Sequence, residues 1–159
     1  MSKKKICMVG DFAVGKTSLT QKFVNNVFSD KYLTTIGVKI DTAEVSGTKL
    51  IIWDIAGRDS LSPVNISYIV GAAGVVLVAD GTRANTVSGI TDIWQTIAQR
   101  VGDVPIVVAL NKHDSEDWSV SEQSLERFKE LGWPVYFTSA KEGENVSLIF
   151  EDLVEQINA

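Results

Sequence analysis

The chain has 159 residues, of which 45% are hydrophobic and 22% charged, and we expect a single globular domain over residues 1–159. The net charge of -5 at pH 7 argues against a nucleic-acid-binding protein, because such proteins carry a basic face. Cys7 is the single cysteine, and the apolar run around it is too short for a signal peptide or a membrane span, so we expect a cytoplasmic protein.

Apolar, β-rich stretches alternate with helical patterns along the chain, which predicts βαβ units around a mainly parallel sheet. In chain order, a strand over about 5–10 is followed by a glycine-containing turn and by a helix over about 15–25. Val38–Val45 and 50–54 then predict two strands, joined by a hairpin turn at Ser46-Gly47-Thr48.

The second half of the chain predicts further strands separated by helices. Gly74–Asp80 and 105–111 are continuous apolar runs, as expected of strands buried on both faces, and 135–138 predicts a shorter last strand. Ser121 can cap a helix that Gly132 ends. Two more helices are predicted from apolar residues at helical spacing: Val87, Ile90, Trp94 and Ile97 in one, and Val146, Ile149, Phe150, Leu153 and Ile157 in the other.

Together these elements predict an α/β fold with a doubly wound, six-stranded, mostly parallel sheet and about five helices. In such sheets a ligand lies beyond the carboxyl ends of the strands. The residues directly after each strand are therefore the candidates for a functional site.

The turn after the first strand carries a phosphate-binding pattern. Gly10-Asp11-Phe12-Ala13-Val14-Gly15-Lys16-Thr17 matches the G-x-x-x-x-G-K-[ST] sequence of P-loop nucleoside triphosphatases. Glycines let the backbone turn tightly, so that its amides and the following helix N-terminus point at an anion. Lys16 would add positive charge at the β- and γ-phosphates, and the Thr17 hydroxyl would coordinate Mg²⁺. The expected nucleotide contacts are Phe12, Ala13, Val14, Gly15, Lys16, Thr17 and Ser18.

A guanine pocket is predicted by Asn111-Lys112-His113-Asp114, which directly follows the apolar run 105–110. The Asp114 carboxylate can accept hydrogen bonds from N1–H and the 2-amino group of guanine, whereas adenine would leave it unpaired. Asn111 can bond the base edge and tie the pocket to the phosphate loop, and the Lys112 stem can lie along the base. We interpret His113 as a spacer between Lys112 and Asp114, because the nearby sequence offers it no partner carboxylate or nucleophile for catalysis.

Ser139-Ala140-Lys141 follows the last predicted strand. The backbone amide of Ala140 can donate to guanine O6, where adenine carries an amino group instead. The pattern alone also fits an ordinary loop between a strand and a helix, but three strand ends then converge on one nucleotide. A nucleotide kinase or an ATPase on the same scaffold is a competing interpretation, which Asp114 disfavours.

Together with ThrThrIleGly and TrpAspIleAlaGly, these motifs stand in the order and approximate spacing of the small GTPases. The chain resembles the Ras superfamily, closest to its Rab branch, over essentially its whole length. The resemblance implies a molecular switch in signal transduction that binds GTP or GDP with Mg²⁺ and hydrolyses GTP to GDP and phosphate. A signalling module that binds GTP and has almost no intrinsic hydrolysis is the alternative.

The resemblance also assigns roles in the first switch segment. Thr35 would bind Mg²⁺ and the γ-phosphate in the GTP state; Thr34 is the competing candidate, which the following IleGly disfavours. Phe28 would pack against the base, although simple core packing is the other explanation for it. Tyr32 would cover the phosphates.

Asp54 and Gly57 form the D-x-x-G pattern of the second switch segment. By resemblance, Asp54 would hold Mg²⁺ through water, and the Gly57 amide would bond the γ-phosphate. The family usually has glutamine next, which orients the attacking water, but this chain has Arg58, which has no acceptor for that water. Arg58 is either a cis-acting arginine finger or a solvent-exposed loop residue, and we favour the latter. Intrinsic hydrolysis is therefore expected to be slow.

Partners are also implied by the resemblance: effectors that read the segments 35–40 and 53–68, an exchange factor and a GTPase-activating protein. Trp53 and Tyr68 match aromatic positions that Rab proteins show to effectors, although both also fit partly buried packing residues. Ile40 replaces the usual phenylalanine, and the bulky Phe12 would crowd an arginine finger from an activating protein. No prenylatable cysteine is present, so we expect no lipid anchor on this chain; a lost tail or a prokaryotic relative would each explain this.

Overall fold

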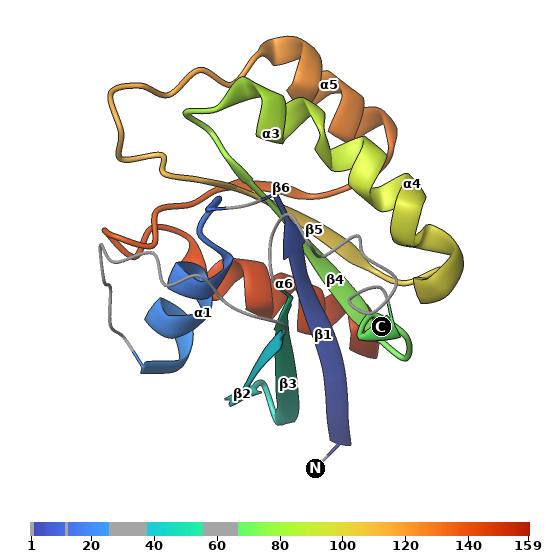
Figure 1. Cartoon of the computed structure of the whole chain (residues 1–159). Helices are drawn as coiled ribbons and strands as arrows, with labels where there is room; N and C mark the ends of the chain where they lie inside the picture. The colour runs from blue at the N-terminus through green and yellow to red at the C-terminus, as the bar shows by residue number, and fades with distance from the viewer. Residues whose placement is uncertain (1, 12, 26–37, 56–66) are drawn as a thin grey trace.

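A six-stranded sheet with the strand order β2-β3-β1-β4-β5-β6 lies at the centre of the computed structural model (Figure 1). The structure describes residues 2–11, 13–25, 38–55 and 67–159. The strands are β1 (Ser2–Gly10), β2 (Val38–Val45), β3 (Thr48–Ile55), β4 (Gly74–Asp80), β5 (Ile106–Asn111) and β6 (Val135–Phe137). Neighbouring strands are parallel except for β2 and β3, which are antiparallel. The predicted mostly parallel, doubly wound sheet is confirmed.

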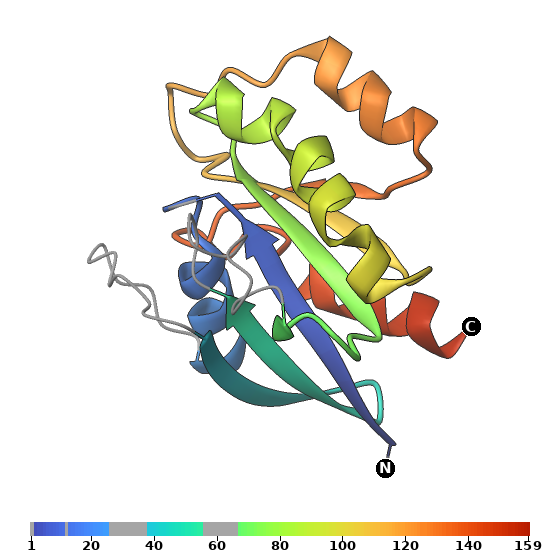
Figure 2. The ribbon, with the colours of Figure 1, turned by 45° about the vertical axis from the view of Figure 1, so that its right-hand side comes forward.

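Helices cover both faces of this sheet (Figures 1 and 2). They are α1 (Lys16–Asn25), α3 (Ala84–Ser88), α4 (Ile90–Val101), α5 (Glu122–Glu130) and α6 (Val146–Asn158). Apolar residues of α1 and α6, such as Leu19 and Phe150, form one core with Ile6 of β1. The helices α3, α4 and α5 pack on the other face, where Ile97 and Phe128 join a second core. β4 and β5 are buried along their whole length, as their continuous apolar sequences predict.

The β2–β3 hairpin has a tighter turn than predicted. Ser46 and Gly47 alone form the loop, with φ of 49° and 80°, while Thr48 already pairs with Val45. Two consecutive residues with positive φ are typical of a type I′ turn, whose twist suits a hairpin. β1 is also longer than predicted, because its polar start at Ser2 pairs in register with Thr48 of β3.

The prediction of one helix through Val87, Ile90, Trp94 and Ile97 is wrong in one respect, because the chain forms α3 and α4 with a break at Gly89. Gly89 has φ -75° and ψ -10°, and its N–H donates to the carbonyl of Asn85 at 3.0 Å. Glycine has a low helix propensity, which fits a break at this position. The predicted cap is confirmed: the Ser121 hydroxyl accepts a hydrogen bond from the Ser124 N–H at 3.1 Å, and Gly132 follows α5 with φ 74°.

None of the helices within residues 2–11, 13–25, 38–55 and 67–159 is long and apolar enough to cross a membrane.

Candidate functional site

The predicted site residues of the described ranges gather at one edge of the sheet. In the parallel register, Gly10 at the end of β1 lies beside Val78 of β4, and Asp80 at the end of β4 lies beside Asn111 at the end of β5. Asp54 lies one residue before the end of β3, which pairs with β1 on its other side. The carboxyl ends of these strands therefore meet, which is where a doubly wound sheet binds its ligand.

The backbone between β1 and α1 needs small residues at two positions. Gly15 has φ 107°, and a Cβ there would lie 2.1 Å from Nδ2 of Asn111. A Cβ on Gly10 would lie 2.2 Å from the carbonyl oxygen of Val78. Ala13 between them also has a positive φ, of 58°. Both glycines of the G-x-x-x-x-G pattern are thus needed because the loop passes close to neighbouring segments at these two positions. Gly15 is also needed for its positive φ.

Lys16 places its ammonium inside this loop. Its Nζ donates to the carbonyls of Gly10 at 3.2 Å and Asp11 at 2.9 Å, and the residue is only 6% exposed. Burial lowers the pKa of Lys16 to about 8, although the negative charges of Asp54 and Asp11 oppose this shift. A buried cation surrounded by the loop backbone is suited to bind phosphate oxygens.

Thr17 and Asp54 provide hard oxygen ligands beside Lys16. The Thr17 hydroxyl donates to the Asp54 carboxylate, which is 1% exposed. Burial raises the pKa of Asp54, while the Thr17 hydrogen bond and the Lys16 charge oppose this rise. Within the described ranges no group of three or more His, Cys, Asp or Glu side chains could hold a metal. One hydroxyl and one carboxylate fit Mg²⁺, which binds few protein ligands and completes its shell with water and phosphate oxygens.

Asn111 connects three segments at the other end of the site. The buried side chain donates through Nδ2 to the carbonyl of Val14 at 3.1 Å. Its Oδ1 accepts from the Thr138 hydroxyl at 3.1 Å and from the Ala140 N–H at 3.3 Å. The predicted link between the guanine pocket and the phosphate loop is therefore present in the structure.

Asp114 is held by the segment that follows β6. The Ser139 hydroxyl donates to its Oδ1 at 2.8 Å, and the same hydroxyl accepts from the Glu142 N–H at 3.0 Å. Lys141, next along this segment, is exposed. Asn111, Asp114, Ser139 and Ala140 are thus brought together from two chain segments, as the sequence analysis predicts.

Asp80 is a member of this network that the sequence analysis missed. Lys112 donates to it at 2.8 Å and also reaches the carbonyl of Ala13 at 3.3 Å, while Arg83 donates at 3.1 Å. Burial by itself raises the pKa of Asp80, but hydrogen bonds from Lys112, Thr82 and Arg83 outweigh it and hold the pKa below its ordinary value. Its position directly at the end of a fully apolar strand could have indicated Asp80 as a site residue.

The single histidine has a carboxylate partner in the structure, although the sequence near it offers none. His113 Nδ1 lies 2.9 Å from Glu144, which is 31 residues away in the sequence. No pattern of neighbouring residues could reveal that pairing.

Six predicted site residues lie outside the described ranges: Phe12, Phe28, Tyr32, Thr35, Gly57 and Arg58. Their roles stay predictions. Ser18 lies in the first turn of α1, next to Thr17.

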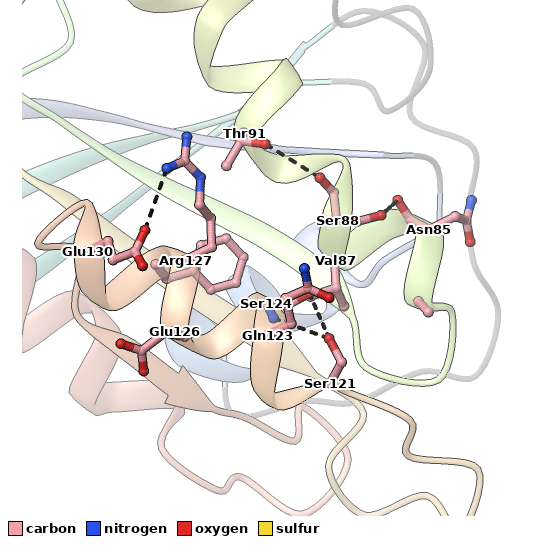
Figure 3. Close-up of a pocket in the computed structure, with 12 residues that line it drawn as sticks. Asn85, Val87, Ser88, Thr91, Ser121, Gln123, Ser124, Glu126, Arg127 and Glu130 are labelled. Carbon is pink, nitrogen blue, oxygen red and sulfur yellow. Dashed lines mark hydrogen bonds and ion pairs between the residues drawn. The ribbon is translucent and has the colours of Figure 1, made fainter.

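A separate hollow lies between α3 and α5 (Figure 3). It has a volume of about 660 Å³ and is lined by residues that include Val87, Phe128 and Arg127. None of its lining residues belongs to the predicted nucleotide site, and some of its polar groups bond one another, as in the Arg127–Glu130 pair at 3.8 Å. This hollow is therefore distinct from the site at the strand ends.

Comparison with known proteins agrees with this geometry. Residues 5–159 match the model of the Ras family. The chain is 36% identical over 159 residues to the Ras-related protein SEC4 of Saccharomyces cerevisiae, covering 96% of this chain and 74% of that protein. It is 38% identical over 160 residues to SEC4 of Candida albicans, covering 96% and 76%. It is 32% identical over 167 residues to human Ras-related protein Rab-7L1, covering 96% and 81%.

Proposed function

This chain belongs to the Ras family, whose Rab-like members are GTP-binding switch GTPases that use Mg²⁺, and we propose which of its residues carry these tasks. The observation that carries the proposal is the meeting of the ends of β1, β3, β4 and β5 at one edge of the sheet. At that edge lie a buried lysine and a hydroxyl–carboxylate pair. Asn111, bonded to the Val14 carbonyl, and Asp114, bonded to the Ser139 hydroxyl, lie there too.

The phosphates of GTP or GDP are held by the loop between β1 and α1. The backbone amides of Ala13, Val14, Gly15 and Ser18 donate to phosphate oxygens, and Phe12 contributes its amide to the same turn. Lys16 spans the β- and γ-phosphates. Thr17 and Asp54 would hold Mg²⁺, Asp54 through water, and Thr35 would join them in the GTP state. When bound, Mg²⁺ neutralises charge on the phosphate oxygens.

The base is held at the ends of β5 and β6. The Asp114 carboxylate accepts from guanine N1–H and the 2-amino group, with Ser139 fixing its orientation. The Ala140 amide, which donates to Oδ1 of Asn111 at 3.3 Å in the structure, would turn to guanine O6 when the base is bound. The stem of Lys112, stretched between Asp80 and Ala13, lies along the base face. Lys141 and Phe28 border the base on its open sides.

Hydrolysis is the attack of water on the γ-phosphate. Lys16 and the Gly57 amide stabilise the charge that develops on the γ-phosphate oxygens, and Tyr32 covers the phosphates. The chain has Arg58 where the family usually has a glutamine that orients the water, and a guanidinium cannot accept a hydrogen bond from water. Intrinsic hydrolysis is therefore slow.

A surface for effectors is formed by β2, β3 and the segment before β4. Ile40 lies opposite Trp53 in register and is 49% exposed, and the rings of Trp53 and Tyr68 lie 6.1 Å apart. The ammonium of Lys5 lies 3.7 Å from the centre of the Trp53 ring. An effector that packs apolar side chains on this patch would read the switch segments 35–40 and 53–68 beside it.

Single-turnover hydrolysis of protein-bound GTP tests the role of Arg58. We compare wild type with Arg58→Gln and Arg58→Ala. Faster hydrolysis in Arg58→Gln and an unchanged rate in Arg58→Ala are expected. A slower rate in Arg58→Ala that Arg58→Gln does not restore would instead make Arg58 a catalytic arginine finger.

Nucleotide loading tests the base pocket and separates the alternative of a module that binds GTP without hydrolysing it. Asp114→Ala should lose selective loading with GDP over ADP. Wild type should convert its bound GTP slowly but completely. GTP that stays intact for hours on wild-type protein would support the non-hydrolysing module.

A further inference from the structure

A hydrogen-bonded side-chain pair lies between the two segments that carry the base-binding residues. His113 Nδ1 is 2.9 Å from one carboxylate oxygen of Glu144 and 3.1 Å from the other. His113 directly precedes Asp114 in the segment after β5, and Glu144 lies between Ser139 and the start of α6. The pair therefore crosses from one base-binding segment to the other.

Main-chain hydrogen bonds fix both members of the pair close to the base-binding groups. The His113 N–H donates to the carbonyl of Thr138 at 3.0 Å, and the Glu144 carbonyl accepts from the Ser139 N–H at 3.1 Å. Asp114 and Ser139 lie within the same cross-linked region and share their own hydrogen bond of 2.8 Å. Displacing Glu144 or His113 would thus shift the position of the Asp114 carboxylate.

The imidazole is oriented by aromatic neighbours. Its ring centre lies 4.7 Å from that of Trp118 at an interplanar angle of 66°, and 5.0 Å from that of Phe137 at 50°. Trp118 and Phe137 also contact each other, with centres 5.3 Å apart. On the opposite side, Asn145 follows Glu144 with φ 56° and donates to the carbonyl of Phe137 at 2.9 Å. The imidazole is thus held in place by its surroundings, so little of its rotamer freedom is lost when it pairs with Glu144.

We propose that the His113–Glu144 pair is a clasp that positions Asp114 and slows the release of bound guanine nucleotide. The inference rests on the proposed guanine pocket and adds two positioning residues to it. A base can leave only when the segments after β5 and β6 move apart, and each bond between them slows that motion. Because the two side chains are 34% and 42% exposed, the effect is limited to about a two- to five-fold change in release rate.

Release of a fluorescent GDP analogue from the full chain, chased with excess GDP, measures the effect of the clasp. The variants are Glu144→Ala, His113→Phe, which keeps a ring beside Trp118, and the double variant. Glu142→Ala is the matched control, since it removes the same charge from the same loop. Each single clasp variant should release GDP about two- to five-fold faster, with the double variant no faster than the faster single. Wild-type rates in both single variants, or additive effects, would overturn the clasp.

Base selectivity separates positioning from a general loss of structure. IDP lacks the 2-amino group that Asp114 is proposed to bind, so loosening Asp114 should speed GDP release more than IDP release. His113→Asn, which keeps a donor near the position of Nδ1, should release GDP at close to the wild-type rate. Equal acceleration with both nucleotides would show that the pair does not position Asp114 and would overturn the proposal.

Asp114→Ala distinguishes failure of the clasp from failure of the guanine pocket. If Asp114→Ala leaves GDP affinity unchanged, the proposed pocket itself is wrong. If it weakens GDP binding while Glu144→Ala and His113→Phe release GDP at the wild-type rate, only the clasp is wrong.

Discussion

The phosphate end and the base end of the site are built in different ways. At the phosphate end, one continuous segment between β1 and α1 does the work, through positive φ angles at Ala13 and Gly15 and one buried lysine. At the base end, side chains from segments far apart in the sequence bond one another. Asn111 reaches Val14, which is 97 residues away, and Ser139 reaches Asp114.

The difference fits what each end is proposed to bind. A phosphate is a compact anion with acceptors on all sides, so a tight turn of backbone amides and one cation can hold it. A base presents a flat edge with a fixed order of donors and acceptors, which requires side chains at set positions. One end therefore depends on local backbone conformation, and the other depends on cross-links between loops.

The largest expected effect is at the phosphate end. Lys16→Met removes the buried ammonium and should lower GDP affinity about 100-fold or more, a loss of about 3 kcal/mol. Equilibrium titration with a fluorescent GDP analogue measures it. Lys22→Met, a change of the other charged residue of α1, is the control and should leave affinity unchanged. A loss of less than ten-fold in Lys16→Met would contradict the placement of Lys16 at the phosphates.

Gly15→Ala should damage both ends at once, because its Cβ would lie 2.1 Å from the Asn111 amide. We expect a loss of about 2 to 3 kcal/mol in the free energy of unfolding, from backbone strain and displaced hydrogen bonds. Gly47→Ala is the matched control, since Gly47 also has a positive φ but nothing lies within 4 Å of its Cβ position. It should cost about 1 kcal/mol. Equal losses in urea unfolding would show that contact with Asn111 is unimportant.

Asp80→Asn tests the carboxylate that holds Lys112 at the base end. It should lower the free energy of unfolding by about 1 to 2 kcal/mol at pH 7, because it weakens charge-assisted hydrogen bonds to a buried group. The pKa of Asp80 is held below its ordinary value in the folded state, so its stabilising effect is complete above the unfolded-state pKa of about 3.9. The effect is lost as the pH falls through the lower, folded-state pKa.

The difference in free energy of unfolding between wild type and Asp80→Asn, measured with urea, should therefore shrink as the pH falls from about 5 to about 2. Asp117→Asn, at an exposed position, is the control and should show a gap close to zero throughout. A gap at Asp80 that widens with acid would reverse the sign and contradict the pairing with Lys112.

The smallest expected effect lies outside both ends. Ser121→Ala removes the cap of α5 and should cost about 1 kcal/mol in urea unfolding. The rate of GDP release should not change, because none of the cap's hydrogen bonds reaches the base-binding segments. Faster GDP release in this variant would mean that the base end responds to general stability rather than to its own cross-links.

Several features of the fold were predictable because their signals are local. The apolar run Gly74–Asp80 is a buried strand, and Ser121 caps a helix, as predicted. The start of β1 at Ser2 was missed, because its polar residues become strand only through pairing with β3. The break at Gly89 was missed as well, because apolar spacing continues across it from Val87 to Ile90.

By itself, the sequence predicted the candidate phosphate loop, the strands that end at the site and the candidate base-reading motifs, since each is a short contiguous pattern with its own chemistry. Only the tertiary structure decided how the motifs are held: Asn111 against Val14, Asp80 against Lys112, and His113 against Glu144. Parallel strands bring their carboxyl ends to one edge, but which side chains meet there depends on strand register and loop conformation. Those quantities arise from contacts between distant segments, and no local pattern encodes them.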